Sequence, residues 1–254
     1  MLVFLIPLKA KASAADWTRV SRLCERTLMS ACAQTCPDFR IILSCTDLPE
    51  TGFTHPNLII EQHEYPPVDR HCRQSQSLDK VLKLSRASGR AREFAPCHVM
   101  VLDADDLVSR RLAGFVDGLA DPMSWRIDHG WLYQEGSRWI WRHRDLSSVC
   151  GSTHLVYCEP EDLPAAPEQG ELLLTAHIPH TEITHELARR GREIRPLPFP
   201  GTIYSAAHGD NWSEGYMFQR RSWRTHLQRL SRMRPLTTRI RREFGLHPIE
   251  TSLP

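Results

Sequence analysis

The acidic run Asp103-Ala104-Asp105-Asp106 is the strongest candidate for chemistry, because it directly follows an apolar segment over 97–102. Alternate residues of an extended chain point to the same side, so Asp103 and Asp105 can share one ligand. Two carboxylates at this spacing suit Mn²⁺ or Mg²⁺, which would take its remaining ligands from water and a substrate diphosphate. A solvated acidic turn is the competing interpretation of so short a motif.

The elements before this motif alternate between strand and helix patterns. Apolar runs predict buried strands over 2–8, 39–45, 57–61 and 97–102, and spacings of three and four residues predict helices over 17–31 and 78–94. Such alternation predicts an α/β fold whose mostly parallel sheet binds its ligand at the carboxyl ends of the strands. Asp47 and Asp103 both fall at such ends, so we expect them to lie at the ligand site.

The second half of the chain is less regular. An aromatic-rich stretch over 131–141 predicts an antiparallel hairpin that turns at Glu135-Gly136-Ser137. A further strand is expected over 155–157, and a short helix over 182–190 that Gly191 ends. The Pro-rich segment over 194–204 has the pattern of a strand.

Length and composition indicate a globular chain of one to two domains. The 254 residues carry a formal net charge of +2, 41% are hydrophobic, and the mean hydropathy is −0.39, which disfavours a disordered or membrane-spanning chain. The eight cysteines form no CxxC pair, so we interpret them as reduced core residues. The apolar start over 2–8 lacks the basic flank and cleavage site of a signal peptide, and we expect a cytoplasmic location.

Taken in order, these motifs resemble the GT-A nucleotide-sugar glycosyltransferases, especially bacterial members akin to family 2. The matching segments run over about residues 1–213. They are Phe4–Leu8, Leu28–Gln34, Ile42–Asp47, the pair Asp79-Lys80, Leu102–Asp106, Cys150–Thr153, Leu197–Tyr204 and His208–Ser213. The resemblance implies a Rossmann-like sheet flanked by helices and the transfer of a sugar from a nucleoside diphosphate to a glycan or lipid-linked saccharide.

The resemblance also implies roles for individual residues. Mn²⁺ or Mg²⁺ would be held by Asp103 and Asp105, and Asp105 would act in catalysis. His208 would be a third ligand of the metal or a direct contact of the diphosphate. The residues implied in binding the nucleotide sugar are Pro7, Asp47, Asp79, Lys80, Asp103, Asp106, Ser152 and Asn211.

One departure from the family concerns the general base. Many inverting members carry a Glu-Asp pair about a dozen residues before a glycine, whereas this chain has Pro179-His-Thr-Glu-Ile183 before Gly191. His180 or Glu182 would have to accept the proton of the acceptor hydroxyl, and general-base assistance is typically worth about 10²- to 10⁴-fold in rate. The stereochemical outcome is left open, with inversion favoured.

The C-terminal segment differs in charge from the rest. Nine arginines lie between Arg220 and Arg242, against two glutamates beyond residue 218. Apolar residues recur among them at helical spacing, and Pro235 interrupts the pattern, so we expect two short amphipathic helices. The chain is thus divided into a glycosyltransferase domain over 1–213 and a basic tail over 214–254. Such a tail could lie on the anionic inner face of the cytoplasmic membrane, and packing on the catalytic body or binding of nucleic acid are the alternatives.

Two other functions stay open. A sugar-phosphate nucleotidyltransferase would share the α/β layout and the metal, although no Gly-rich phosphate-binding signature follows the first strand. A non-catalytic domain of transferase-like fold could bind membranes or RNA through its tail, although the intact Asp103 and Asp105 argue against it. Nucleic acid is an unlikely partner because no recognition motif accompanies the arginines.

Overall fold

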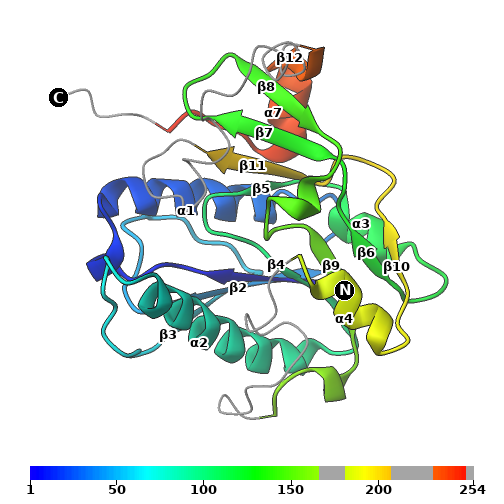
Figure 1. The fold of residues 1–254 in the computed structure, drawn as a ribbon, viewed down its shortest axis with the longest axis horizontal. Helices are drawn as coiled ribbons and strands as arrows, with labels where there is room; N and C mark the ends of the chain where they lie inside the picture. Colours follow the sequence, from blue (N-terminus) through cyan, green and yellow to red (C-terminus); the bar gives the residue numbers. More distant parts are fainter. Residues whose placement is uncertain (166–180, 207–230, 250–254) are drawn as a thin grey trace.

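The protein is built on two β-sheets, seen in a computed structural model that describes residues 1–165, 181–206 and 231–249 (Figure 1). The larger sheet contains, in spatial order, β10 (Ile194–Pro196), β6 (Ser124–Arg126), β9 (His154–Cys158), β4 (Cys97–Val101), β1 (Leu2–Pro7), β2 (Phe39–Cys45) and β3 (Leu58–Gln62). The smaller sheet contains β12 (Met233–Pro235), β8 (Trp139–His143), β7 (Gly130–Gln134), β11 (Thr202–Ala206) and β5 (Leu107–Val108).

The larger sheet is mostly parallel. Strands β4, β1, β2 and β3 run in the same direction, β10 is parallel to β6, and only β9 runs against its neighbours β4 and β6. Strand β1 is buried along its whole length, as its unbroken apolar sequence predicts for a central parallel strand. The expected α/β class, with a mostly parallel sheet flanked by helices, is confirmed.

The two long helices cover opposite faces of this sheet. Alternate residues of β1 point to opposite faces, so Phe4 lies in one core with Leu28 of α1 (Trp17–Cys32), whereas Leu5 lies in another with Leu84 of α2 (Arg73–Ala91). The carboxylate of Asp16 caps α1 by accepting the backbone N–H of Arg19. The described residues also form three shorter helices, α3 (Leu112–Asp117), α4 (Ile183–Arg189) and α7 (Thr238–Phe244).

Two expected elements before the basic tail differ from those observed. Helix α2 begins at Arg73, five residues before the expected start, because its first turn is polar and carries no apolar periodicity. The expected strand over 194–204 is two strands, and these belong to different sheets. Pro198 and Pro200 lie between β10 and β11 and cannot donate ladder hydrogen bonds, which explains the break.

The described part of the arginine-rich segment is built into the smaller sheet. Met233–Pro235 pairs with β8 as strand β12, in place of the expected helix. Helix α7 follows, and Phe244 and Leu246 are buried with Ile203 of β11. Tail residues 214–230 and 250–254 lie outside the described residues. Within the described ranges, no helix is long and apolar enough to cross a membrane.

Candidate functional site

The candidate site lies where the larger sheet changes its winding direction. From β1 the chain passes through α1 to β2 and on to β3, whereas α2 returns it to β4 on the other side of β1. In open α/β sheets, ligands bind at the carboxyl ends of the strands beside such a switch point. Asp103 follows β4 and Asp47 follows β2, so both expected strand-end acids are at this edge.

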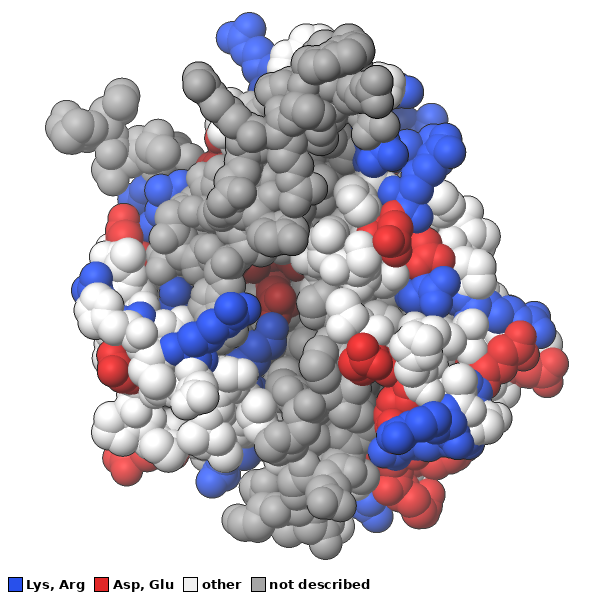
Figure 2. Space-filling view, in the orientation of Figure 1, with Lys and Arg blue, Asp and Glu red and all other residues white. Residues whose placement is uncertain are grey.

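Lys80 of α2 contacts the acidic motif directly. Its Nζ lies 2.5 Å from Oδ1 of Asp103, and the two side chains are 41% and 28% exposed. Burial by itself would lower the pKa of Lys80, but the charge and hydrogen bond of Asp103, with Asp105 and Asp106, raise it above its ordinary value. Lys80 therefore stays cationic at neutral pH. Figure 2 shows acidic and basic side chains meeting near the middle of one face of the molecule.

Asp106, unlike Asp103, is fully buried. Its carboxylate accepts hydrogen bonds from Ser152 Oγ at 2.6 Å and from the backbone N–H of Ser205 at 3.1 Å. Ser152 Oγ in turn accepts the backbone N–H of Asp103 at 2.9 Å. Burial, followed by the charges of Asp105 and Asp103, raises the pKa of Asp106 well above its usual range. In this arrangement Asp106 and Ser152, both expected to bind the nucleotide sugar, hold the turn that presents Asp103.

Gly151 provides room beside the second oxygen of Asp103. A Cβ atom at position 151 would lie 3.3 Å from Asp103 Oδ2, tighter than an ordinary van der Waals contact. Any residue other than glycine at position 151 would therefore displace Asp103 Oδ2 from its present position. The small-residue segment Cys150–Thr153 therefore shapes the site through its backbone.

The exit of β2 forms the other half of the site. The backbone N–H of Lys11 donates to Asp47 Oδ2 at 2.8 Å, which ties the segment after β1 and Pro7 to the segment after β2. Asp79 is not directed to solvent: it is 6% exposed and pairs at 2.7 Å with the fully buried Lys83. Its Oδ1 and the Oγ1 of Thr46 are buried without a hydrogen-bond partner among the described residues.

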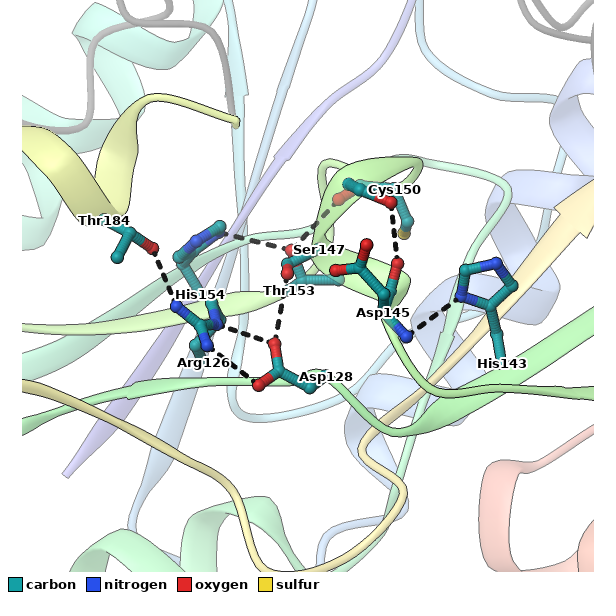
Figure 3. A network of polar contacts seen from close by, with 10 residues as sticks. Arg126, Asp128, His143, Asp145, Ser147, Cys150, Thr153, His154 and Thr184 are labelled. Atoms are coloured by element: carbon teal, nitrogen blue, oxygen red, sulfur yellow. Dashed lines mark hydrogen bonds and ion pairs between the residues drawn. The ribbon is translucent and has the colours of Figure 1, made fainter.

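The sequence did not predict a further polar network, drawn in Figure 3. Arg126 at the end of β6 donates to both carboxylate oxygens of Asp128, at 2.6 and 2.9 Å, and Nη1 approaches Thr184 Oγ1 of α4 at 3.5 Å. Burial tends to raise the pKa of Asp128, but the hydrogen bond and charge of Arg126 bring it below its usual value. The registers of β6 with β9 and of β9 with β4 place this pair at the same sheet edge as Asp103.

The remaining predicted residues are only partly described. Glu182 is exposed and directly precedes α4, two residues before Thr184. The Glu182 carboxylate therefore lies at the N-terminal end of α4, the same end at which Thr184 contacts Arg126. His180, His208 and Asn211 lie outside the described residues.

The donor set at the sheet edge fits a divalent cation in part. Asp103 and Asp105 supply the hard oxygen ligands that Mg²⁺ and Mn²⁺ prefer. In the ranges 1–165, 181–206 and 231–249, however, no three His, Cys, Asp or Glu side chains converge as a ligand set. An ion held here would need water or substrate oxygens to complete its coordination, which is usual for Mg²⁺.

Comparison with known proteins gives likenesses among solved structures alone, and these are distant. No protein-family model and no curated protein match the sequence. Among solved structures, the fold is similar to that of S. aureus TarS, a glycosyltransferase, at 13% identity and a TM-score of 0.37. The match covers 82% of this chain and 37% of that one, so this chain spans little more than a third of its length. A likeness this distant identifies no activity, which has to be argued from the site.

Proposed function

We propose that the protein is a metal-dependent glycosyltransferase that moves a sugar from a nucleoside-diphosphate sugar to a glycan or lipid-linked saccharide. The observation that carries this proposal is the position of Asp103, Asp105 and Lys80 at the switch point of the parallel sheet. This position combines two carboxylates, which suit a divalent cation, with an ammonium group, which suits phosphate oxygens. Open α/β sheets bind nucleotides at this edge.

The donor would bind along the carboxyl ends of β1, β2 and β4. Asp47 would hydrogen-bond the nucleoside, and the buried Asp79 would support this side of the site through its ion pair with Lys83. Lys80 would contact the diphosphate while Asp103 and Asp105 hold Mn²⁺ or Mg²⁺. When bound, the cation would neutralise the charge that develops on the departing diphosphate.

The acceptor would approach from the side of β6 and α4. The Arg126–Asp128 pair contacts Thr184 there, and Glu182 or His180 would take the proton of the attacking hydroxyl. Asp128 is a weaker candidate base, because its lowered pKa and its two hydrogen bonds from Arg126 reduce its proton affinity.

The test is a donor screen on the full chain. UDP-, GDP- and dTDP-sugars are added with Mn²⁺, and thermal stabilisation and release of nucleoside diphosphate are measured. We expect one class of donor to raise the melting temperature and to be hydrolysed slowly without acceptor. Asp105→Asn should remove both effects by weakening the cation site.

Asp117→Asn is the matched control, because Asp117 is an exposed aspartate at the end of α3. It loses the same charge and should leave donor binding unchanged. The proposal is wrong if no nucleotide sugar stabilises the protein, or if the two variants behave alike. Release of pyrophosphate from a nucleoside triphosphate would instead indicate a nucleotidyltransferase.

A further inference from the structure

A second charged site lies on helix α7, at the end of the molecule away from α2 (Figure 1). A cavity of about 310 Å³ opens there, at the lower end of the roughly 300–1,000 Å³ typical of small-molecule sites. We call it the arginine pocket. Its lining residues are Arg110, Thr238, Arg239, Arg242 and Glu243.

The charges in the arginine pocket do not balance. Glu243 is its only acid, and Glu243 Oε1 already accepts hydrogen bonds from Ser109 Oγ at 2.5 Å and from Arg111 Nε at 2.7 Å. Within the described part of the chain, no carboxylate forms an ion pair with Arg110, Arg239 or Arg242. The pocket therefore presents three guanidinium groups that form no ion pair with a described carboxylate, beside one glutamate.

Arg110 adds a second observation. Its Nε is buried without a hydrogen-bond partner among the described residues. A buried donor on a charged group is costly unless an acceptor reaches it. The guanidinium fork matches the oxygens of a phosphate group, so a bound phosphate would satisfy this atom and the excess charge together.

The pocket is separate from the donor site. Phe244 of α7 and Ile203 of β11 are buried together on the outer face of the smaller sheet, whereas the next residue on β11, Tyr204, lies in the core shared with α1 and β1. Successive residues of a strand point to opposite faces. Phe244 of α7 thus packs on the face of the smaller sheet opposite to the core that contains Tyr204.

We propose that Arg110, Arg239 and Arg242 form a binding site for a phosphate group. Two sources share this chemistry, the headgroup of an anionic phospholipid and a soluble phosphorylated compound. The site is independent of the proposed glycosyl transfer. None of its residues belongs to the acidic sheet edge, by which we mean Asp103, Asp105 and Lys80 at the carboxyl ends of the parallel strands.

The experiment uses two probes on the full chain, both with a chelator present so that the acidic sheet edge holds no metal. Co-sedimentation is measured with phosphatidylcholine vesicles with and without phosphatidylglycerol, and binding of inorganic pyrophosphate is measured by calorimetry. The test variant carries Arg239→Gln and Arg242→Gln, two exposed positions where glutamine keeps the helix propensity close to that of arginine. Thermal unfolding confirms that it is folded.

The control variant carries Arg189→Gln and Arg195→Gln. It loses the same charge at two exposed arginines that already pair with Glu186 and Glu193. We expect the test variant to bind at least one probe about tenfold or more weakly than wild type, and the control to change by less than about twofold.

The two probes distinguish the source of the phosphate. Binding to phosphatidylglycerol vesicles that pyrophosphate competes away indicates a lipid headgroup, and pyrophosphate binding without vesicle binding indicates a soluble ligand. The proposal is overturned if wild type binds neither probe, or if both variants lose binding equally. Asp105→Asn should bind both probes like wild type, so a failure of the proposed transferase activity would leave this result standing.

Discussion

The acidic sheet edge and the arginine pocket each carry an excess of one charge, negative at the sheet edge and positive in the pocket. At the sheet edge, Asp103 and Asp105 lie with a single lysine, Lys80, which is already paired. In the arginine pocket, three arginines surround a single glutamate, Glu243, which is already hydrogen-bonded. In each place the minority charge is occupied inside the protein, so the majority charge decides the sign of the ligand. The comparison predicts that a cation binds first at the sheet edge and then receives the anionic diphosphate, whereas an anion binds directly in the arginine pocket.

Asp103→Asn should give the largest difference between the two regions. It removes one cation ligand and the partner of Lys80, and we expect kcat/KM for sugar transfer to fall by about 10²-fold or more. Binding of pyrophosphate at the arginine pocket with a chelator present should not change. Steady-state kinetics and calorimetry on the same preparation measure both. If sugar transfer and pyrophosphate binding were lost together, the two regions would be coupled.

Gly245→Ala should weaken the region of the arginine pocket through the backbone. Gly245 has φ of +61° at the end of α7, and an added Cβ would lie 3.0 Å from the Cα of Ser30. We expect the free energy of unfolding to fall by about 1–2 kcal/mol, because a left-handed residue with a side chain is strained. Urea denaturation measures it. Gly52→Ala, where the added Cβ would meet nothing within 4 Å, is the control and should change stability little.

Gly151→Ala should affect the acidic sheet edge without affecting stability to the same degree. The added Cβ would lie 3.3 Å from Asp103 Oδ2, so the carboxylate must move by a few tenths of an ångström. We expect kcat/KM to fall about tenfold, since catalytic geometry tolerates little displacement. Unfolding in urea should change by under about 1 kcal/mol. An unchanged kcat/KM would mean that this oxygen of Asp103 has no part in the reaction.

The sequence predicted those parts of the molecule that depend on local patterns. Strand β1 is an unbroken apolar run and β4 is apolar except for His98, and a carboxylate directly after such a strand must lie at the sheet edge. The start of α2 was missed because its first turn is polar and its N-cap, Cys72, makes no side-chain capping bond. The functional roles at the sheet edge stay predictions.

The parts that were not predicted depend on contacts between distant segments. Arg126 and Asp128 have the same alternate spacing as Asp103 and Asp105, but their place at the same edge follows only from the pairing of β6 with β9. The arginine pocket likewise joins Arg110 to Arg239, which are about half the chain length apart in the sequence. No periodicity within one segment could bring these residues together.

Asp128→Asn tests the Arg126–Asp128 pair through the pH dependence of stability. Asp128 has a lowered pKa in the folded state, so its ionised form stabilises the fold above the unfolded pKa of about 3.9. That contribution is lost as pH falls through the folded pKa. We expect the wild-type unfolding free energy to decrease below about pH 4, and the variant, about 1 kcal/mol less stable at pH 7, to lack this part of the slope. Parallel slopes would contradict the paired state of Asp128.

Glu243→Gln should produce the smallest change in binding, and it tests directly whether excess positive charge makes the arginine pocket bind anions. The amide oxygen of glutamine can still accept the hydrogen bonds of Ser109 and Arg111, so α7 should keep its place. Only the negative charge is removed, and pyrophosphate should bind about two- to fivefold more tightly at low salt, with the gain shrinking as salt rises. Glu93→Gln, at an exposed glutamate paired with Arg90, should leave binding unchanged. Weaker pyrophosphate binding in Glu243→Gln would mean that the Glu243 carboxylate helps to hold the ligand. Excess positive charge would then not be the reason for anion binding.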